Sequence, residues 1–159
     1  MKPLQQLANR FAENRINNIH FKNKSSQQNG PINAYCKLKE RPLTANSCVP
    51  QYTGWKTNKF TIKINNSDNC VKIKNGSLVL LENIATSKID NNKILVVGRC
   101  YEKIQDFVNT PCSSQLLDIH EVRQLGSLQS WPLEEVVNKL VRLPLNGDKF
   151  VLIPFAHDT

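Results

Sequence analysis

An Asn75-Gly76 pair lies between two apolar runs, and it constrains the fold more than any other feature of the chain. Both central residues of a type I′ turn require positive φ, which Asn and Gly tolerate, so the pair predicts a tight β-hairpin. In the run before the pair, Val71 and Ile73 alternate with lysines, as in a strand with one buried face. The run after it, residues 77–86, is apolar on both faces, which indicates a central strand.

Similar segments, separated by turn residues, recur along the second half of the chain. Gly98 indicates a β-bulge, and Pro154 puts the last strand at a sheet edge or marks its end. A helical turn is expected from Pro132. We expect strands at residues 59–64, 70–74, 77–86, 93–103, 114–122, from about 139, and at 149–157. The pattern predicts a mainly β fold, a small antiparallel barrel or strongly bent sheet of about six strands.

Two further regions precede this β domain, which we place at residues 58–159. Residues 1–20 are expected to form a short amphipathic helix, because apolar residues recur there at helical spacing. The apolar stripe of this helix consists of Leu4, Leu7, Ala8, Phe11 and Ala12. Residues 21–57 combine a polar run, prolines and scattered apolar residues, which predicts a basic loop or linker with one short strand around residues 34–38.

Positive charge is concentrated in the first half of the chain. Residues 1–75 contain thirteen Lys or Arg and three acidic residues, whereas residues 76–159 contain eight basic and ten acidic residues. This asymmetry indicates an anionic partner, and basic side chains supply phosphate affinity without sequence preference. If the strands at 59–64 and 70–74 pair, their lysines form one basic face. The candidate nucleic-acid-binding residues are Lys37, Lys39, Arg41, Lys56, Lys59, Lys63, Lys72 and Lys74.

The same lysines have a second explanation that needs no ligand. Lysine on an exposed edge strand prevents strands of different molecules from pairing. In that case the N-terminal helix and the second half of the chain would serve as a protein-interaction module. The arrangement in space separates the two hypotheses: one contiguous basic face favours nucleic acid, and scattered charges beside an apolar groove favour a protein partner.

No residue pattern in the chain indicates a catalytic or metal site. The phosphate-loop, dinucleotide-binding, zinc-protease and serine-hydrolase motifs are all missing from the sequence. Cys112 and His120 are a candidate thiol–imidazole pair, but the Pro-Cys-Ser-Ser stretch around Cys112 is typical of a turn. His120 with Glu121 and Cys100 makes an equally weak metal site. We expect a protein that is not an enzyme and that uses no cofactor or metal.

The cysteines and the N-terminus predict an intracellular chain. Five cysteines, an odd number without a C-x-x-C pair, favour free thiols over a disulfide framework or a zinc site. The N-terminal segment lacks the apolar core of a signal peptide, and no stretch approaches the roughly 18 apolar residues of a transmembrane helix. We expect an intracellular, nuclear protein without a membrane partner.

Several segments resemble known families. The run from residue 69 to 144 is similar in outline to a bromo-adjacent homology (BAH) domain, through VLLENI, ILVVGRCYEKIQDF and WPLEEVVNKLVRLP. The segments DNCVKIKNG (68–76), DFVNTPCSS (106–114), LLDIHEV and IPFAH resemble a C-terminal β module of uncharacterised, transposon-derived insect proteins. These motifs consist of turn and core residues, so they specify fold more than function.

The resemblance to BAH domains implies a chromatin-associated module that binds nucleosomes or other proteins and has no catalytic site. BAH domains that read histone peptides use an aromatic cage, but the nearby Tyr101, Phe107 and Trp131 do not match cage positions. Taken with the charge, the resemblance predicts a non-enzymatic nucleic-acid- or chromatin-binding module of mobile-element origin. The alternative is a protein-interaction module whose basic face serves only to keep it soluble.

Overall fold

The computed structural model describes residues 29–35, 41–65 and 68–155, which form one nine-stranded antiparallel sheet with two short 3-10 helices. The strands are β1 (Gly30–Tyr35), β2 (Ser47–Lys56), β3 (Thr61–Lys63), β4 (Cys70–Ile73), β5 (Leu78–Ser87), β6 (Ile94–Asp106), β7 (His120–Pro132), β8 (Val136–Pro144) and β9 (Phe150–Pro154). The short helices are η1 (Ser114–Leu117) and η2 (Leu133–Glu135). The predicted mainly β, antiparallel fold is confirmed. The helix predicted over residues 1–20 lies outside the described residues.

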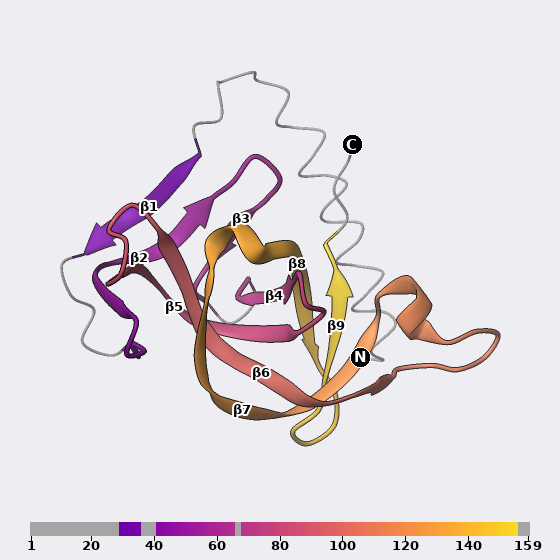
Figure 1. The fold of residues 1–159 in the computed structure, drawn as a ribbon. Coiled ribbons are helices and arrows are strands. Elements are labelled where there is room, and N and C mark those ends of the chain that lie inside the picture. The colour runs from indigo at the N-terminus through magenta and orange to yellow at the C-terminus, as the bar shows by residue number, and fades with distance from the viewer. Residues whose placement is uncertain (1–28, 36–40, 66–67, 156–159) are drawn as a thin grey trace.

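Six of the strands are hydrogen-bonded in a ring. From β5 the pairings run through β4, β8, β9, β7 and β6, and β6 pairs with β5 again. β5 can pair with three strands because β4 and β2 divide one of its edges, at residues 78–80 and 84–87, while β6 follows the other edge. Figure 1 shows the bent strands of the ring, with β1 and β2 on one side and the β6–β7 connection projecting on the other.

β1, β2 and β3 extend the sheet from the far end of β5. The prediction that residues 21–57 form a loop or linker is therefore wrong where the structure describes them. Ser47 and Gln51 of β2 are polar but buried, so this strand lacks the apolar alternation that would have revealed it. Pro50 lies at a register shift between Cys48 and Gln51, where its missing N–H interrupts no ladder.

The Asn75-Gly76 hairpin is confirmed, and it joins β4 to β5. Its turn differs from the predicted type I′ geometry, because only Gly76 has a positive φ, of 90°. The Gly76 N–H donates to the Ile73 oxygen, and the Ile73 N–H donates to the Ser77 oxygen, both at 2.9 Å. Three residues thus form the loop, with glycine in its last position, which is a common alternative for hairpins.

The segment from 114 to 122, predicted as one strand, contains η1 followed by the start of β7 at His120. Asp118 ends η1 with a φ of 60°, and this left-handed residue redirects the chain into β7. The boundaries of η2, β8 and β9 lie closer to those that the sequence predicted. η2 follows Pro132 as predicted, β8 begins at Val136 rather than near 139, and β9 ends at Pro154.

β5 and β6 approach so closely that Gly98 has no room for a side chain. A Cβ atom there would lie 2.2 Å from the backbone oxygen of Leu80. The register between the two strands shifts between Leu81 and Asn83, which leaves Glu82 as an extra residue beside the Gly98 pairing. The bulge predicted at Gly98 is therefore present, with the extra residue on the facing strand.

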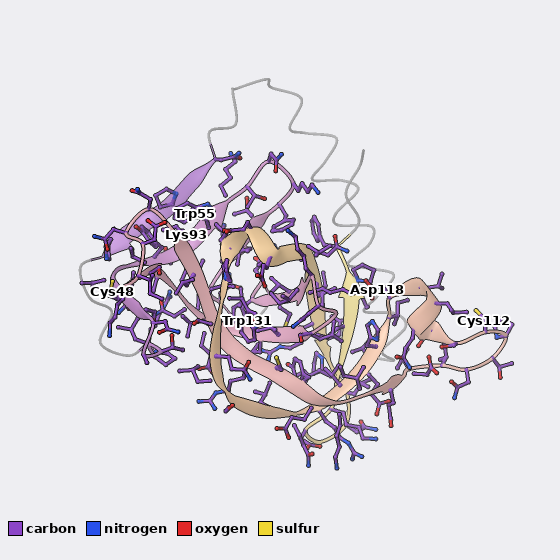
Figure 2. All side chains as sticks on the ribbon, viewed as in Figure 1. Cys48, Trp55, Lys93, Cys112, Asp118 and Trp131 are labelled. Carbon is purple, nitrogen blue, oxygen red and sulfur yellow. The ribbon has the colours of Figure 1, made fainter. Side chains whose placement is uncertain are left out.

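The largest apolar cluster ties β3 to the ring. Phe60 and Ile62, on either side of Thr61, pack with Ile73, Val96 and Trp131, and all five side chains are buried. Figure 2 labels Trp131 near the end of β7. Because the β2–β3 turn lies next to this cluster, it is held beside the start of β6 and beside η2.

We predict that Gly98→Ala lowers the free energy of unfolding by about 2–3 kcal/mol, because the new methyl group forces β5 and β6 apart. Gly126→Ala is the matched control. Its Cβ would lie 3.0 Å from the flexible Glu102 carboxylate, so its effect should stay within about 1 kcal/mol. Urea unfolding of both variants measures the difference. Equal effects would show that the close approach at Gly98 does not limit stability.

Candidate functional site

A pocket of about 430 Å³ opens where three segments distant in the sequence meet. The first is the turn between β2 and β3, the second is the turn between β5 and β6, and the third is η2 with the start of β8. The apolar wall consists of Phe60, Ile94, Leu133 and Val136, which belong to or pack against the largest core cluster. The pocket therefore lies directly on the core.

The β2–β3 turn is held by the hydroxyl of Thr57. This oxygen accepts the backbone N–H groups of Lys59 and Phe60 at 3.2 and 3.1 Å, and the hydroxyl donates to the Phe60 oxygen at 2.9 Å. A threonine that bonds its own turn in this way fixes the backbone locally. Asn58 and Lys59 are thus presented to solvent from an ordered turn.

The β5–β6 turn is ordered in a similar way by Ser87 and Asp90. The Ser87 hydroxyl accepts the Ile89 N–H at 3.2 Å, and an Asp90 carboxylate oxygen accepts the Asn92 N–H at 3.0 Å. The Lys93 N–H donates to the Asp90 backbone oxygen at 2.9 Å. Figure 2 labels Lys93 in this turn, just before β6. Asn92 and Lys93 therefore mirror Asn58 and Lys59 on the opposite side of the pocket.

The third side of the pocket carries a negative charge. Glu134 of η2 lines the pocket together with Leu133. The hairpin between β4 and β5 lies next to η2, because the Lys74 N–H donates to the Glu135 oxygen at 2.9 Å. The pocket thus combines two ammonium groups, two amides and one carboxylate above an apolar wall.

Lys59 and Lys93 are exposed, and no ion pair within the described part of the chain engages them. Several other basic groups are already neutralised by partners. The pairs are Lys72–Asp118, Arg99–Glu82, Lys139–Asp68 and Lys149–Glu121, with N–O distances of 2.7 to 3.2 Å. The two pocket lysines therefore retain their charge for an external anion.

The structure separates the predicted basic residues. Lys37 and Lys39 lie outside the described residues, and Arg41 donates to the backbone oxygen of Tyr52 at 3.1 Å. Lys56 is half-buried at the end of β2, and Lys63 is exposed on β3.

The expectation of one basic face across residues 59–64 and 70–74 is wrong. β3 pairs with β2, whereas β4 pairs with β5 and β8, so the two lysine-bearing strands are not neighbours. Of the predicted residues that the structure describes, only Lys59 lines the pocket. Lys74 lies close by, beside η2.

Lys72 belongs to a different cluster. Its ammonium group lies 2.7 Å from one carboxylate oxygen of Asp118, and the Nε2 atom of His120 lies 2.8 Å from the same oxygen. Burial acts to raise the pKa of Asp118, but the hydrogen bonds from Lys72 and His120 outweigh it and hold the pKa below its usual 3.8. This cluster ties β4 to the end of η1 and makes Lys72 a structural residue.

Cys112 and His120, the candidate thiol–imidazole pair, lie in different surroundings. Figure 2 places Cys112 at the outer end of the β6–β7 connection and Asp118 nearer the ring. His120 is bonded to Asp118, and its Nδ1 atom is buried. Burial raises the pKa of the Cys70 thiol to about 12, so this thiol is protonated at neutral pH. The four cysteines in the described segments are free.

The described residues also bear on metal, cage and membrane hypotheses. They contain no group of three side chains that could hold a metal ion, and no helix among them is long and apolar enough to cross a membrane. Tyr101, Phe107 and Trp131 belong to three different apolar clusters, so they do not form one aromatic cage.

Sequence reasoning did not identify Asn58, Asn92, Lys93 or Glu134 as site residues. Asn58, Asn92 and Lys93 lie in turns and Glu134 lies in the short η2, and polar residues are ordinary in such segments and carry no periodic signal. The missing information was topological. The pairings of the ring, together with the packing of Phe60 on the core, bring these segments to one place.

The fold and pocket define an antiparallel β domain with a basic-rimmed, open pocket. The chain belongs to the family described as "Domain of unknown function (DUF8592)", whose model matches residues 26–155. This match spans β1 to β9 and includes all three pocket segments. No curated protein and no solved structure matches the chain.

We predict that Asp118→Asn lowers the free energy of unfolding at pH 7 by about 1–2 kcal/mol, a discounted value because the pair is partly exposed. Asparagine tolerates the same left-handed backbone, so the change removes mainly charge. Because the pKa of Asp118 is lower in the folded state than its ordinary value of 3.8, its ionised carboxylate stabilises the fold above pH 3.8. This contribution is lost as the pH falls through the folded-state pKa. The difference from wild type should therefore shrink below about pH 3.8.

Urea titrations at pH 7 and at pH 3 measure this difference. The control is Asp148→Asn, a change of the same charge at an exposed position in the β8–β9 turn, which should alter neither titration. A penalty for Asp118→Asn that stayed the same at both pH values would contradict the role of the ion pair.

Proposed function

We propose that this protein is a non-enzymatic nucleic-acid-binding module that contacts phosphates at the rim of the pocket. The observation that carries the proposal is the pair of exposed ammonium groups, Lys59 and Lys93, on opposite ordered turns. Basic groups without partners gain most from phosphate, because the contact releases counterions and breaks no internal ion pair.

Two further lysines support the proposal, and two are excluded from it. Lys56 directly precedes the β2–β3 turn, and Lys74 lies beside η2, so both can extend the rim. Lys72 is excluded because Asp118 binds it. Lys63 is excluded because β3 pairs only with β2 in the described part of the sheet, and lysine on an edge strand needs no ligand.

A chromatin-associated, nuclear role is part of the same proposal. It is supported by the resemblance of residues 69–144 to BAH domains and by the net charge of +8, which suits an anionic partner. The resemblance to transposon-derived proteins supports an origin in a mobile element. Recognition of methylated lysine is left out, because the three aromatic side chains lie apart.

We predict that Lys59→Gln with Lys93→Gln weakens binding of a 15-nucleotide single-stranded DNA about 20-fold near 0.1 M salt. The slope of log K against log salt should fall by about 1.4, because each phosphate contact on a single strand contributes about 0.7. Fluorescence anisotropy between 50 and 200 mM salt measures both quantities.

The matched control is Lys103→Gln with Arg123→Gln, which removes the same charge from a paired position on β6 and β7 outside the pocket. It should leave affinity within about 3-fold and the slope within about 0.5. Urea midpoints show that all variants fold. The proposal fails if wild type does not bind at 50 mM salt, or if the control loses as much affinity as the pocket variant.

A second candidate function is protein binding through the β6–β7 connection, residues 107–119. Leu116 and Leu117 of η1 are 78% and 62% exposed, and Val108 is 49% exposed. Such apolar side chains on a projecting segment are typical of an interaction surface. The partner that fits is an apolar segment with basic flanks, because residues 104–121 contain three acidic residues and no Lys or Arg.

The negative charge available to a partner beside this connection comes mainly from Asp106, the last residue of β6. The Ser113 hydroxyl and the Gln115 N–H donate to its carboxylate and hold its pKa below 3.8, so it is ionised at neutral pH. The other two acidic groups, Asp118 and Glu121, are paired with lysines. Asp106 is therefore the carboxylate left for a basic flank.

We predict that a synthetic amphipathic peptide, with leucines along one helical face and lysines along the other, binds the wild-type chain. Binding should fall at least about 10-fold in Leu116→Asp with Leu117→Asp, because the apolar contact area is lost. Ile89→Asp, an equally exposed apolar residue in the β5–β6 turn, is the control and should have little effect. Equal binding by all three proteins, or none, would exclude this surface.

A further inference from the structure

The side chains around the pocket offer more than a counter-charge for phosphate. Asn58 and Asn92 face the opening from opposite turns, and no hydrogen bond within the described residues engages their side-chain amides. Each amide provides both donors and an acceptor. A phosphate can use only the donors of an amide, whereas the polar edge of a base can use the acceptor as well.

The remaining wall indicates a flat, partly apolar ligand. Ile94, Leu133 and Val136 form an apolar surface beside Phe60, and the pocket volume of about 430 Å³ lies within the usual range for small-molecule sites. A nucleobase has an apolar face and a polar edge, and it is joined to phosphates on both sides. The two ammonium groups lie at the rim, where the flanking phosphates of a bound nucleotide would fall.

Glu134 narrows the choice of base. A carboxylate at a phosphate-binding rim reduces affinity for any anion, so its presence in the lining needs a compensating contact. An ionised carboxylate only accepts hydrogen bonds, and the exocyclic amino group of cytosine, adenine or guanine donates them. Thymine and uracil lack that amino group and offer only a ring N3–H between two carbonyl oxygens, so the carboxylate accommodates them less well.

We propose that the pocket binds one unpaired nucleotide whose base carries an exocyclic amino group, with Glu134 accepting from that group and Lys59 and Lys93 on the flanking phosphates. The inference rests on the proposed function and names the ligand of the same site. It requires an unpaired base, because a base inside a duplex cannot enter the pocket without leaving its stack.

The test is fluorescence anisotropy of the full chain at pH 8 and 100 mM salt with labelled dC15, labelled dT15, and a mixed 15-nucleotide strand with its duplex. We expect dC15 to bind about 5-fold more tightly than dT15, the low end for one base contact. We also expect the single strand to bind more tightly than the duplex. If only phosphates were contacted, the duplex would bind more tightly than the single strand, because a duplex carries more phosphates per unit length.

Glu134→Gln is the discriminating variant. Its amide can donate to thymine and accept from cytosine, so the ratio of dC15 to dT15 affinities should fall close to 1. Glu135→Gln is the matched control, since it makes the same change of charge at the neighbouring residue, which does not line the pocket. It should keep the wild-type ratio.

The outcomes separate this inference from the proposed function. If no oligonucleotide binds, the proposed function itself is wrong. If binding occurs with a salt slope that depends on Lys59 and Lys93, but wild type binds dC15 and dT15 equally, phosphate binding stands and the base pocket is overturned. Tighter binding of the duplex than of the single strand would also overturn it.

Discussion

The close contact between β5 and β6 at Gly98 is the constraint on which the rest of the structure depends. β5 hydrogen-bonds to β4, β6 and β2, so it belongs both to the ring and to the extension of the sheet. Beside the bulge, β6 approaches the β5 backbone so closely that no side chain fits at Gly98. The ring places the turn before β6 near η2, and the packing of Phe60 and Ile62 on the core holds the turn before β3 beside them, so the three segments form the pocket.

The fold was predictable where buried side chains alternate or where a turn needs a particular residue. β3, β4, β5 and β9 follow from such patterns, and so does the hairpin at Asn75-Gly76. β2 was missed because its buried residues include Ser47 and Gln51, which carry no hydrophobic signal. Residues 114–117 were misassigned because exposed leucines in η1 imitate a buried strand.

The candidate site was less predictable than the fold. The lysines that alternate with apolar residues suggested a basic face. That face required β3 and β4 to be neighbours, and local sequence patterns do not determine the order of strands in a sheet. Lys72 is paired with Asp118 at the end of η1, 46 residues away in the chain, and no local pattern reveals this pairing. Lys93 and Glu134 were missed for the converse reason: their importance comes only from what the ring places opposite them.

The origin of the pocket in three separate turns affects how the family can be studied. Each segment contributes one to three polar side chains, and no short stretch of sequence contains the whole set. A peptide cut from any one segment would therefore lack the site, and a linear motif could not describe it. Surface turns also accept substitutions more readily than core strands do. One scaffold is consequently compatible with different pocket linings, because each of the three segments can change without the other two.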